Sequence, residues 1–405
     1  MEILEKVILI GVQLEDGFDV SASLEELSEL ASTAGAETVG RVIQNRESVH
    51  PGTYIGKGKI DEVKELLWET EATGIICDDE LSPAQMKNLQ DMLDTKVMDR
   101  TVLILDIFAS RATTSEGKIQ VELAQARYSL TRLSGYGVSM SRLGGGIGTR
   151  GPGETKLETD RRRIRDRISQ LKKELTEMQK RREVNRALRE KNHTPVIAIV
   201  GYTNAGKSTL LNRLTGANVL SEDRLFATLD PTTRSLRLPS GENVLFTDTV
   251  GFINKLPHHL IDAFRSTLEE AKYADIILHV TDASNPEEEK QMSTVYSTLS
   301  GLNVTGKPII TVFNKCDLTE AKNGYFRDPR AERCIRVSAL TGEGIPALLA
   351  AVEEILKESK VYIERKYDFK DAGKVQLIRK YGQLLSEEYT EEGIFIKAFV
   401  PREYA

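Results

Sequence analysis

The sequence predicts an α/β protein with four parts: an N-terminal α/β domain, a long antiparallel helical pair, a second α/β domain and a small C-terminal α/β appendage. Short apolar runs alternate with helical patterns over residues 1–110 and again over residues 193–360, as in parallel sheets with flanking helices. Residues 111–192 are helical on both sides of a glycine-rich stretch. Within residues 361–405, Val361–Tyr367, Ala372–Tyr389 and Ile394–Val400 read as strand, helix and strand. A chain of 405 residues, 40% hydrophobic and 29% charged, can bury several cores.

The N-terminal domain opens on a βαβ pattern. Val7–Val12, Leu24–Ala31 and Thr38–Ile43 read as strand, helix and strand. The alternation continues through Ile60–Trp68, Gly74–Cys77, Pro83–Leu93 and Thr101–Phe108. Because successive strands are separated by helices, we expect a mostly parallel sheet.

A glycine- and lysine-rich loop, Pro51–Lys59, precedes a helical pattern in this domain. Its backbone N–H groups could hold a phosphate or an RNA backbone at the helix N-terminus. A plain tight turn is the alternative. No phosphate-loop signature occurs in this domain.

The helical pair is predicted from an apolar seam at heptad-like spacing. The seam consists of Leu157, Ile164, Ile168, Leu171, Leu175 and Met178. Its other faces carry Arg161–Arg163, Arg165 and Arg167, and Arg142 and Arg150 edge the glycine-rich stretch Leu143–Glu154. A glycine loop surrounded by arginines suits an RNA backbone, so we expect an RNA contact at this tip.

The net charge of −6 is unevenly distributed. Residues 150–191 hold 15 Lys and Arg against 8 Asp and Glu, a local charge of +7 that leaves −13 on the rest of the chain. A basic arm between acidic bodies attracts phosphate-rich surfaces, which makes a large RNA a reasonable partner. A solvated helix face is the alternative.

The second α/β domain opens with a phosphate-binding loop. The apolar run Val196–Val200 is followed by glycines at the spacing that lets backbone N–H groups close around phosphate oxygens. The lysine of this loop reaches the β and γ phosphates, and the final hydroxyl takes one position on Mg²⁺. The predicted nucleotide-binding residues here are Gly201, Tyr202, Thr203, Asn204, Ala205, Gly206, Lys207 and Ser208.

Two further motifs select GTP. The Asp317 carboxylate can accept hydrogen bonds from both N1–H and the 2-amino group of guanine, a donor pair that adenine lacks. Asp248 can reach Mg²⁺ through water, and the Gly251 N–H can sense the γ phosphate. The predicted nucleotide-binding residues of these two motifs are Asp248, Thr249, Val250 and Gly251, then Asn314, Lys315, Cys316 and Asp317. A later loop, Ser338, Ala339 and Leu340, is predicted to place backbone N–H groups near the guanine oxygen.

The first switch needs a threonine whose hydroxyl joins Mg²⁺ when the γ phosphate is present. Thr228, Thr232 and Thr233 are candidates, and we favour Thr228. The predicted segment is Phe226, Ala227, Thr228, Leu229 and Asp230. The predicted metal ligands are therefore Ser208 and Thr228, with Mg²⁺ as the cofactor of GTP.

No catalytic residue is assigned. Phe252 stands directly after Gly251, where many small GTPases have a water-orienting glutamine. A phenyl ring cannot hydrogen-bond water, so we predict slow hydrolysis that another group or a partner accelerates. His258 and His259 are better interpreted as solvated residues.

Cysteine usage and hydropathy predict a cytoplasmic protein. Cys77, Cys316 and Cys334 lie far apart without metal-site spacing and are predicted to be reduced. The N-terminus lacks a signal-peptide pattern, and no window approaches about 18 uninterrupted apolar residues. We expect neither stable membrane association nor a DNA partner; the oligomeric state stays open.

Over nearly its whole length the chain resembles the HflX family of ribosome-associated GTPases, in the translation-factor-related class of P-loop GTPases. The glycine-rich loop together with the phosphate loop is the discriminating pair. The matching stretches are Pro51–Lys59, Lys118–Gln125, Gly144–Thr155, Leu157–Arg161, Gly201–Ser208, Phe226–Arg234 and Asp248–Phe252.

The resemblance implies a GTP-hydrolysing switch that binds the large ribosomal subunit and its RNA when loaded with GTP, with splitting or rescue of stalled or hibernating ribosomes. It implies that Ser208 and Thr228 ligate Mg²⁺, that Gly251 senses the γ phosphate, and that Asn314 and Asp317 read guanine. Family members also share the phenylalanine at position 252. The alternative function is an RNA-binding or remodelling module whose GTPase domain is regulatory.

Overall fold

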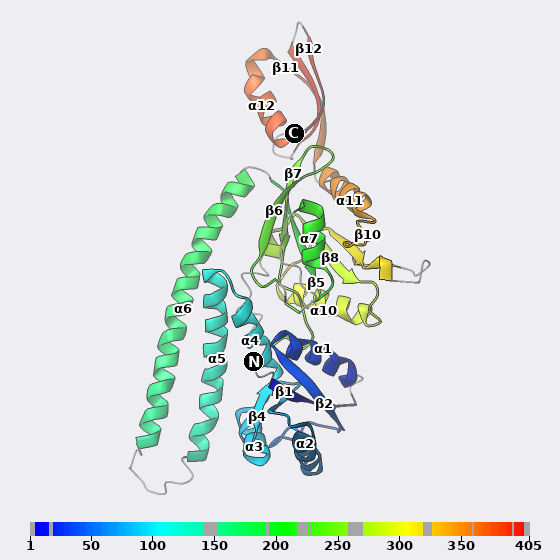
Figure 1. Cartoon of the computed structure of the whole chain (residues 1–405). Helices are drawn as coiled ribbons and strands as arrows, with labels where there is room; N and C mark the ends of the chain where they lie inside the picture. The colour runs from blue at the N-terminus through cyan, green and yellow to red at the C-terminus, as the bar shows by residue number, and fades with distance from the viewer. Residues whose placement is uncertain are drawn as a thin grey trace. The chain divides into compact units, whose positions relative to one another are not determined.

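The computed structural model describes residues 5–15, 19–140, 152–191, 194–216, 225–226, 228–257, 270–318, 326–358, 360–390 and 393–400. The chain forms two compact units (Figure 1). The N-terminal unit comprises Met1–Gln179, Glu222–Asp230 and Ile253–Ser266. The C-terminal unit comprises Lys180–Ser221, Pro231–Phe252 and Thr267–Ala405.

The N-terminal unit is built on a four-stranded sheet in the order β2-β1-β3-β4, with every pairing parallel. Its core strand β1 is buried at Val7–Ile10, since helices cover a parallel sheet on both faces. The predicted parallel sheet is confirmed. The elements are β1 (Glu5–Gln13), α1 (Val20–Thr33), β2 (Ala36–Asn45), α2 (Lys57–Thr70), β3 (Gly74–Cys77), α3 (Pro83–Leu93) and β4 (Lys96–Asp99).

Side-chain caps fix where the helices of this unit begin. The Asp19 carboxylate accepts hydrogen bonds from the first-turn N–H groups of α1. Ser82 and Gln85 form a reciprocal capping box on α3, with Pro83 at its start. Asp99 ends β4 and accepts from the Val102 N–H, which starts α4 (Arg100–Arg111) directly after the strand. Such caps are each worth about 1 kcal/mol.

The loop Pro51–Lys59 is a tight turn whose amides are used within the protein. The His50 Nδ1 accepts from the Thr53 N–H at 3.1 Å, and the Gly56 N–H donates to Gln44 Oε1 at 2.8 Å. Tyr54 has a left-handed backbone, with φ of 67°, and its side chain is buried. These contacts favour the tight-turn interpretation over an anion-binding loop.

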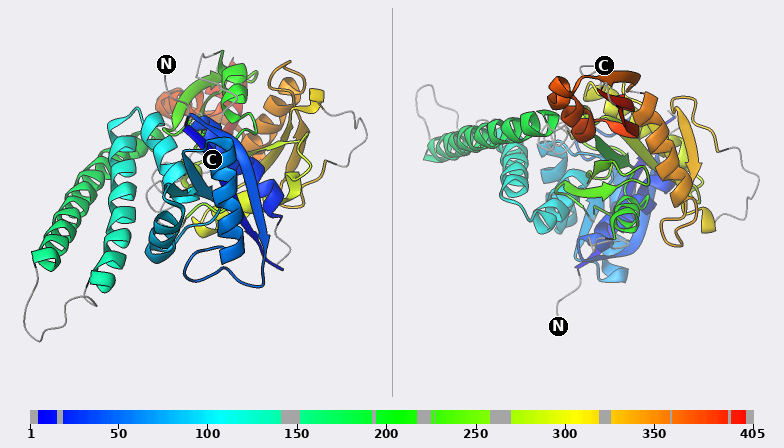
Figure 2. Two further views of the ribbon diagram at one scale, coloured as in Figure 1. Left: turned by 60° about the horizontal axis from the view of Figure 1, so that its bottom comes forward. Right: turned by 90° about the horizontal axis from the view of Figure 1, so that it is seen from above.

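The predicted helical pair consists of α5 (Ser115–Met140) and α6 (Pro152–Lys191), which run side by side in opposite directions (Figure 2). Within the N-terminal unit, Arg167 binds Glu122 at 2.7 Å and Arg161 donates to the Leu133 carbonyl at 3.3 Å. In the predicted seam, Leu171 is buried and the other described side chains are half-buried: Ile164, Ile168, Leu175 and Met178.

Two of the arginines predicted to lie free on the outside of α6 are instead engaged with α5. Arg167 forms an ion pair with Glu122, and Arg161 reaches a carbonyl, because both positions border the apolar seam. Arg162, Arg163 and Arg165 are exposed as expected. Residues 141–151 and the Leu157 side chain lie outside the described residues, so the basic tip of the pair stays a prediction.

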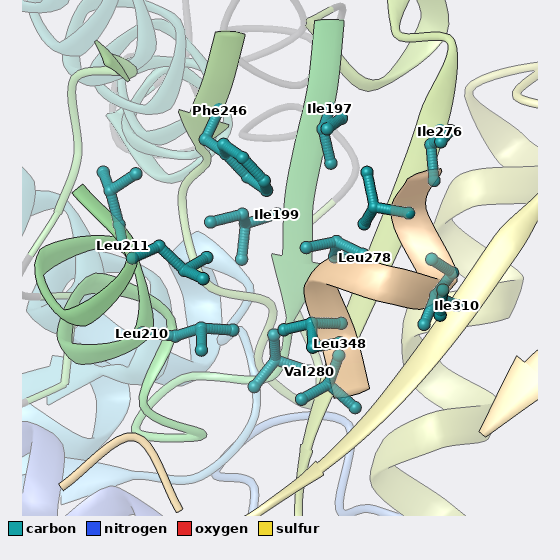
Figure 3. Close-up of a cluster of buried hydrophobic side chains, with 14 of the residues drawn as sticks. Ile197, Ile199, Leu210, Leu211, Phe246, Ile276, Leu278, Val280, Ile310 and Leu348 are labelled. Carbon is teal, nitrogen blue, oxygen red and sulfur yellow. The ribbon is translucent and has the colours of Figure 1, made fainter. Parts of the chain in front are cut away.

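The C-terminal unit contains a six-stranded sheet in the order β10-β9-β8-β5-β7-β6, parallel except for the edge pair β6–β7. Figure 3 shows apolar side chains of β5, β7, β8 and α7 converging on one core with Leu348 of α11. The elements are β5 (Val196–Gly201), α7 (Lys207–Thr215), β6 (Thr232–Arg237), β7 (Asn243–Asp248), β8 (Ile276–Asp282), α10 (Glu288–Gly301), β9 (Ile309–Asn314), η1 (Cys316–Leu318), β10 (Arg333–Arg336) and α11 (Ile345–Glu358).

The appendage is a three-stranded antiparallel sheet in the order β11-β13-β12, with α12 on it. The sequence predicts one helix over Ala372–Tyr389, which is wrong in its second half. The helix ends at Tyr381, Gly382 is extended, and Gln383 starts a strand that pairs with β13. The elements are β11 (Val361–Tyr367), η2 (Phe369–Asp371), α12 (Ala372–Tyr381), β12 (Gln383–Thr390) and β13 (Gly393–Val400).

The cysteines form no disulfide. Cys77 and Cys316 are buried, and Cys334 is half-buried. Among the described helices, none combines the length and apolar character needed to span a bilayer.

A buried histidine lies in β8 of the C-terminal unit. Burial lowers the pKa of His279 to about 4; the Asp328 charge opposes this shift and the Lys207 charge adds to it. The His279 Nδ1 is 4.0 Å from the Asp328 carboxylate, which accepts hydrogen bonds from the hydroxyls of Tyr296 and Thr311. His279 is therefore neutral in the folded protein at pH 7.

We expect the free energy of unfolding to fall as pH is lowered from 7 to 5. The folded-state pKa of His279, about 4, lies below the value of about 6.5 for an exposed imidazole. Neutral His279 therefore makes its full contribution to the free energy of unfolding above its unfolded-state pKa. This contribution is lost as pH falls toward the folded-state pKa, by about 2 kcal/mol at pH 5. Urea unfolding at both pH values measures the loss. In His279→Gln this part of the pH dependence should disappear, and its persistence would contradict the assignment.

Candidate nucleotide-binding site

The phosphate loop joins β5 to α7 in a form that only glycine permits at two positions. A Cβ on Gly201 would lie 2.1 Å from the Val280 carbonyl oxygen, and one on Gly206 would lie 2.2 Å from Asn314 Nδ2. Gly206 also has a left-handed backbone, with φ of 89°, and caps α7 without any side-chain hydrogen bond. A helix N-terminus capped in this way presents its first-turn N–H groups outward, which is the arrangement that binds phosphate.

Lys207 and Ser208, the last two residues of the loop, are buried at the start of α7. The Lys207 Nζ donates to the Tyr202 carbonyl at 2.7 Å. Burial lowers the pKa of Lys207 to about 8, and the Asp248 charge partly offsets this. The Ser208 hydroxyl donates to Asp248 Oδ2 at 2.7 Å, so the structure brings the predicted first and second motifs into contact.

The second motif is tied to the phosphate loop by backbone hydrogen bonds. The Phe252 N–H donates to the Gly201 carbonyl at 3.1 Å, and its carbonyl accepts from the Thr203 N–H at 2.7 Å. A Cβ on Gly251 would lie 2.8 Å from Thr203 Cγ2 and 3.0 Å from Thr203 Cα, so a larger residue there would have to displace the phosphate loop. The Phe252 ring and Val250 are buried, while the Thr249 hydroxyl donates to a β5 carbonyl. Phe252 therefore serves packing, as its chemistry predicts. His258 and His259 lie outside the described residues.

Three of the predicted segments meet at Asn314. Its Nδ2 donates to the Ala205 carbonyl at 2.8 Å, and its Oδ1 accepts from the Ala339 N–H at 2.9 Å. Lys315 is left-handed, with φ of 61°, and pairs with Asp282 at 2.6 Å. These bonds leave the Asp317 side chain exposed, as a base-reading group requires.

The remaining residues of these two loops have mainly structural positions. Cys316 is buried, and its N–H donates to the Val337 carbonyl at 3.3 Å. The Ser338 hydroxyl accepts from the Thr341 N–H at 3.1 Å, which closes the turn after Val337. Leu340 is exposed on that turn.

We expect Asn314→Ala to weaken both folding and nucleotide binding. The substitution leaves the Ala205 carbonyl and the Ala339 N–H without these partners in a buried place, at about 1–3 kcal/mol for each group. Unfolding in urea and titration with fluorescent GDP measure the two effects. Asn88→Ala, which removes one exposed hydrogen bond to Gly52, is the matched control. Unchanged GDP affinity in Asn314→Ala would contradict this role.

The first switch segment lies in the N-terminal unit. Phe226 is buried and meets the Phe108 ring edge-on, with centroids 4.6 Å apart, and Leu229 is buried as well. Ala227 lies outside the described residues. The Asp230 carboxylate accepts hydrogen bonds from Thr113 and Thr114. Burial would raise the pKa of Asp230, but these hydrogen bonds from Thr114 and Thr113 lower it below its usual value.

The rival threonines lie in a strand. Thr232 and Thr233 begin β6, where the Thr233 hydroxyl contacts the Thr247 hydroxyl at 2.9 Å. Thr228 instead lies in an irregular, half-buried segment. Because a switch threonine must change partners with the nucleotide, this arrangement supports Thr228 over the two strand residues.

Several residues around the switches have no sequence signal. Lys255, Thr113 and Thr114 contact residues far away in the chain, and no motif spacing announces such partners. Asp282, the partner of Lys315, follows a buried strand; its place at the carboxyl end of β8 was the signal that could have found it.

Comparison with known proteins identifies the family. Three family models match successive parts of the chain: "GTP-binding GTPase N-terminal" over residues 21–109, "GTP-binding GTPase Middle Region" over residues 111–189, and "50S ribosome-binding GTPase" over residues 196–315. A "GTPase HflX" of Lacrimispora saccharolytica is 64% identical over 402 residues, covering 99% of this chain and 95% of that protein. The chain belongs to the HflX family.

A more distant relative agrees with this membership. A "GTPase HflX" of Escherichia coli is 43% identical to this HflX chain over 354 residues, covering 87% of the chain and 83% of that protein. Among solved structures, a GTP-binding protein from Sulfolobus solfataricus in complex with GDP is 24% identical, with a TM-score of 0.45, covering 88% of this chain and 99% of that one. The resemblance seen in the sequence motifs is confirmed, and this HflX chain is a P-loop GTPase that hydrolyses GTP.

Proposed function

We propose that this HflX chain is a GTP-dependent switch that binds the large ribosomal subunit and its RNA, and that splits or rescues stalled or hibernating ribosomes. The joined nucleotide site carries this proposal: one network of short hydrogen bonds links the phosphate loop, the second motif and the guanine-reading loops. The match to a "50S ribosome-binding GTPase" over residues 196–315 supports the choice of partner.

The predicted site residues receive their roles from this geometry. GTP is held by the phosphate loop Gly201–Ser208, and guanine is read by Asn314 and Asp317 with the loop Ser338–Leu340. The Ser208 hydroxyl and the Asp248 carboxylate offer hard oxygen ligands, which fit Mg²⁺, and Ser208 and Thr228 are the proposed direct ligands. When bound, Mg²⁺ neutralises charge on the β and γ phosphates.

Hydrolysis of GTP by the isolated chain is proposed to be slow. The Phe252 ring is buried and offers no hydrogen bond, so the residue after Gly251 cannot orient a water molecule. The catalytic group is not assigned within the chain. Contact with the ribosome is proposed to complete the site and to accelerate turnover.

The RNA contact is assigned to the helical pair. Arg162, Arg163 and Arg165 form an exposed basic face on α6, and residues 150–191 carry a charge of +7. Such a face binds phosphates through salt-sensitive contacts without reading base sequence. We also propose functional boundaries near residues 110, 192 and 360, a cytoplasmic location, no DNA partner and no stable membrane association.

Pelleting with large ribosomal subunits tests the proposal. We expect the full chain to sediment with subunits in the presence of a nonhydrolysable GTP analogue and to remain in the supernatant with GDP, with weaker binding at higher salt. Equal binding in both nucleotide states would disprove the switch. Failure to bind subunits in either state would disprove the ribosomal partner.

A further inference from the structure

The chain passes between the two units at the ends of both switch segments. Glu222–Asp230 belongs to the N-terminal unit and Pro231 to the C-terminal unit; Phe252 belongs to the C-terminal unit and Ile253 to the N-terminal unit. Thr228 and Gly251 each lie a few residues before one of these crossings. Any displacement of Thr228 by the γ phosphate therefore occurs within the N-terminal unit itself, and any displacement of Gly251 acts on that unit through a few peptide bonds.

A first anchor holds the first switch segment within the N-terminal unit. Asp230 Oδ2 accepts hydrogen bonds from the Thr113 N–H at 2.9 Å, the Thr113 hydroxyl at 2.7 Å and the Thr114 N–H at 2.9 Å, while Oδ1 accepts from the Thr114 hydroxyl. Thr113 and Thr114 immediately precede α5, so a carboxylate supplied from elsewhere in the chain completes the start of that helix.

The space around this carboxylate is shaped for it. A Cβ on Gly117 would lie 2.3 Å from Asp230 Oδ1, so the first turn of α5 approaches the carboxylate as closely as only glycine allows. Phe226, four residues earlier in the same segment, is buried against Phe108 of α4. The predicted first switch segment is thus held by α4 at Phe226 and by the start of α5, the first helix of the helical pair, at Asp230.

A second anchor holds the chain after the second switch. The Lys255 Nζ donates to Asp78 Oδ2 at 2.5 Å and to Asp79 Oδ1 at 2.7 Å. These carboxylates follow β3 at the carboxyl end of the parallel sheet, where parallel sheets bind their ligands. The Tyr54 hydroxyl donates to Asp79 Oδ2 at 2.6 Å, which gives the Pro51–Lys59 turn a role in this acidic socket.

Two basic side chains, Arg100 and Lys255, pair with the buried Asp78 carboxylate. Asp78 is fully buried; the Ser23 hydroxyl donates to it, and Arg100 pairs with it at 2.8 Å as well as with Glu26. Lys255 adds a second positive charge beside Asp78 and also pairs with Asp79. Because an uncompensated buried charge is costly, the socket favours the state in which Lys255 occupies it.

We propose that Asp230 and Lys255 are positioning residues that couple the two switches to the N-terminal unit, so that the γ phosphate changes the start of α5 and hence the RNA-contacting helical pair. The proposal rests on the GTP-driven switch proposed above and adds the residues through which it acts. Neither side chain is assigned a contact with the nucleotide.

Hydrogen exchange of the full chain tests the coupling. With GDP and with a nonhydrolysable GTP analogue, we expect the wild-type protein to exchange the first amides of α5 and the residues around Asp78 at different rates. In Asp230→Ala the Thr113 and Thr114 amides should exchange about 2- to 30-fold faster, as expected for a lost cap. In Lys255→Met the nucleotide-dependent difference around Asp78 should be lost.

Matched variants separate coupling from general destabilisation. Asp19→Ala removes the α1 cap, and Lys96→Met removes an exposed ion pair with Glu5, both in the same unit. We expect both to retain the nucleotide-dependent exchange difference. Asp230→Asn and Lys255→Arg, which keep part of the hydrogen bonding, should restore part of it and replace the larger substitutions if those impair folding.

Two results would overturn the coupling: identical exchange of the N-terminal unit in both nucleotide states of the wild type, or a nucleotide-dependent difference that survives in the Asp230→Ala, Lys255→Met double variant. These outcomes are independent of the ribosome. If hydrogen exchange behaves as expected but the chain does not sediment with large ribosomal subunits, the proposed ribosomal partner is wrong and the coupling stands. If subunits bind in a GTP-dependent manner in the double variant as in the wild type, the coupling fails and the partner stands.

Discussion

Lys207→Met should lower the affinity for GTP by about 30- to 4,000-fold, which corresponds to losing about 2–5 kcal/mol from a buried charge contact. Lys207 is buried and its Nζ donates to the Tyr202 carbonyl within the phosphate loop, so its ammonium lies where a β or γ phosphate would be bound. The loss for GDP should be smaller because GDP lacks the γ phosphate. Equilibrium titration with fluorescent GTP and GDP analogues measures both affinities.

Folding provides the control for this substitution. Burial lowers the pKa of Lys207 to about 8, so holding the charged form there is costly in the nucleotide-free protein. Methionine has a similar volume without the charge, and we expect the free energy of unfolding to stay constant or to increase. Lys374→Met, on exposed α12, should leave affinity unchanged. Wild-type GTP affinity in Lys207→Met would refute the assigned role.

Asp317→Asn should change which base the site accepts. The carboxylate can accept from guanine N1–H and the 2-amino group, and each hydrogen bond to a charged group contributes about 1.5–3 kcal/mol. We therefore expect GTP affinity to fall by on the order of 10²–10⁴-fold. Xanthine has a carbonyl in place of the 2-amino group, so the asparagine amide can donate to it, and the affinity for xanthosine triphosphate should rise.

Competition between GTP and xanthosine triphosphate measures this exchange of specificity. Asp317 is exposed, so the substitution should not affect the free energy of unfolding. Asp371→Asn, at the start of α12, is a control that should keep GTP preference. A uniform loss of affinity for both nucleotides would show that Asp317 supports the loop without reading the base.

The sequence predicts those parts of the fold and site that have a recognisable local pattern, such as a motif spacing or an apolar run. The phosphate loop needs glycine at 201 and 206 because the Val280 carbonyl and Asn314 leave no room for a Cβ. Apolar runs of five or six residues bounded by turns predict the buried parallel strands β5 and β9. The strands are predicted from short apolar stretches, and the two glycines from a recognisable motif spacing, although the atoms that exclude a Cβ lie far along the chain.

The parts that escape prediction depend on distant partners. Arg167 reads as an outward arginine until α5 places Glu122 against it. The strand β12 reads as a continuation of α12 because its residues are mixed in character, and only pairing with β13 makes it a strand. Lys255 binds Asp78 and Asp79, which lie 177 and 176 positions away in the chain, a separation at which spacing carries no information.

The two hydrogen bonds of the Asn314 side-chain amide also affect how this GTPase distinguishes GTP from GDP. They join the guanine-reading loops to the phosphate loop, so these loops have little left to order when a nucleotide binds. GTP and GDP present the same purine to these guanine-reading loops. We therefore expect the protein to distinguish GTP from GDP at the γ phosphate, whose binding energy must outweigh the cost of rearranging Thr228 and Gly251.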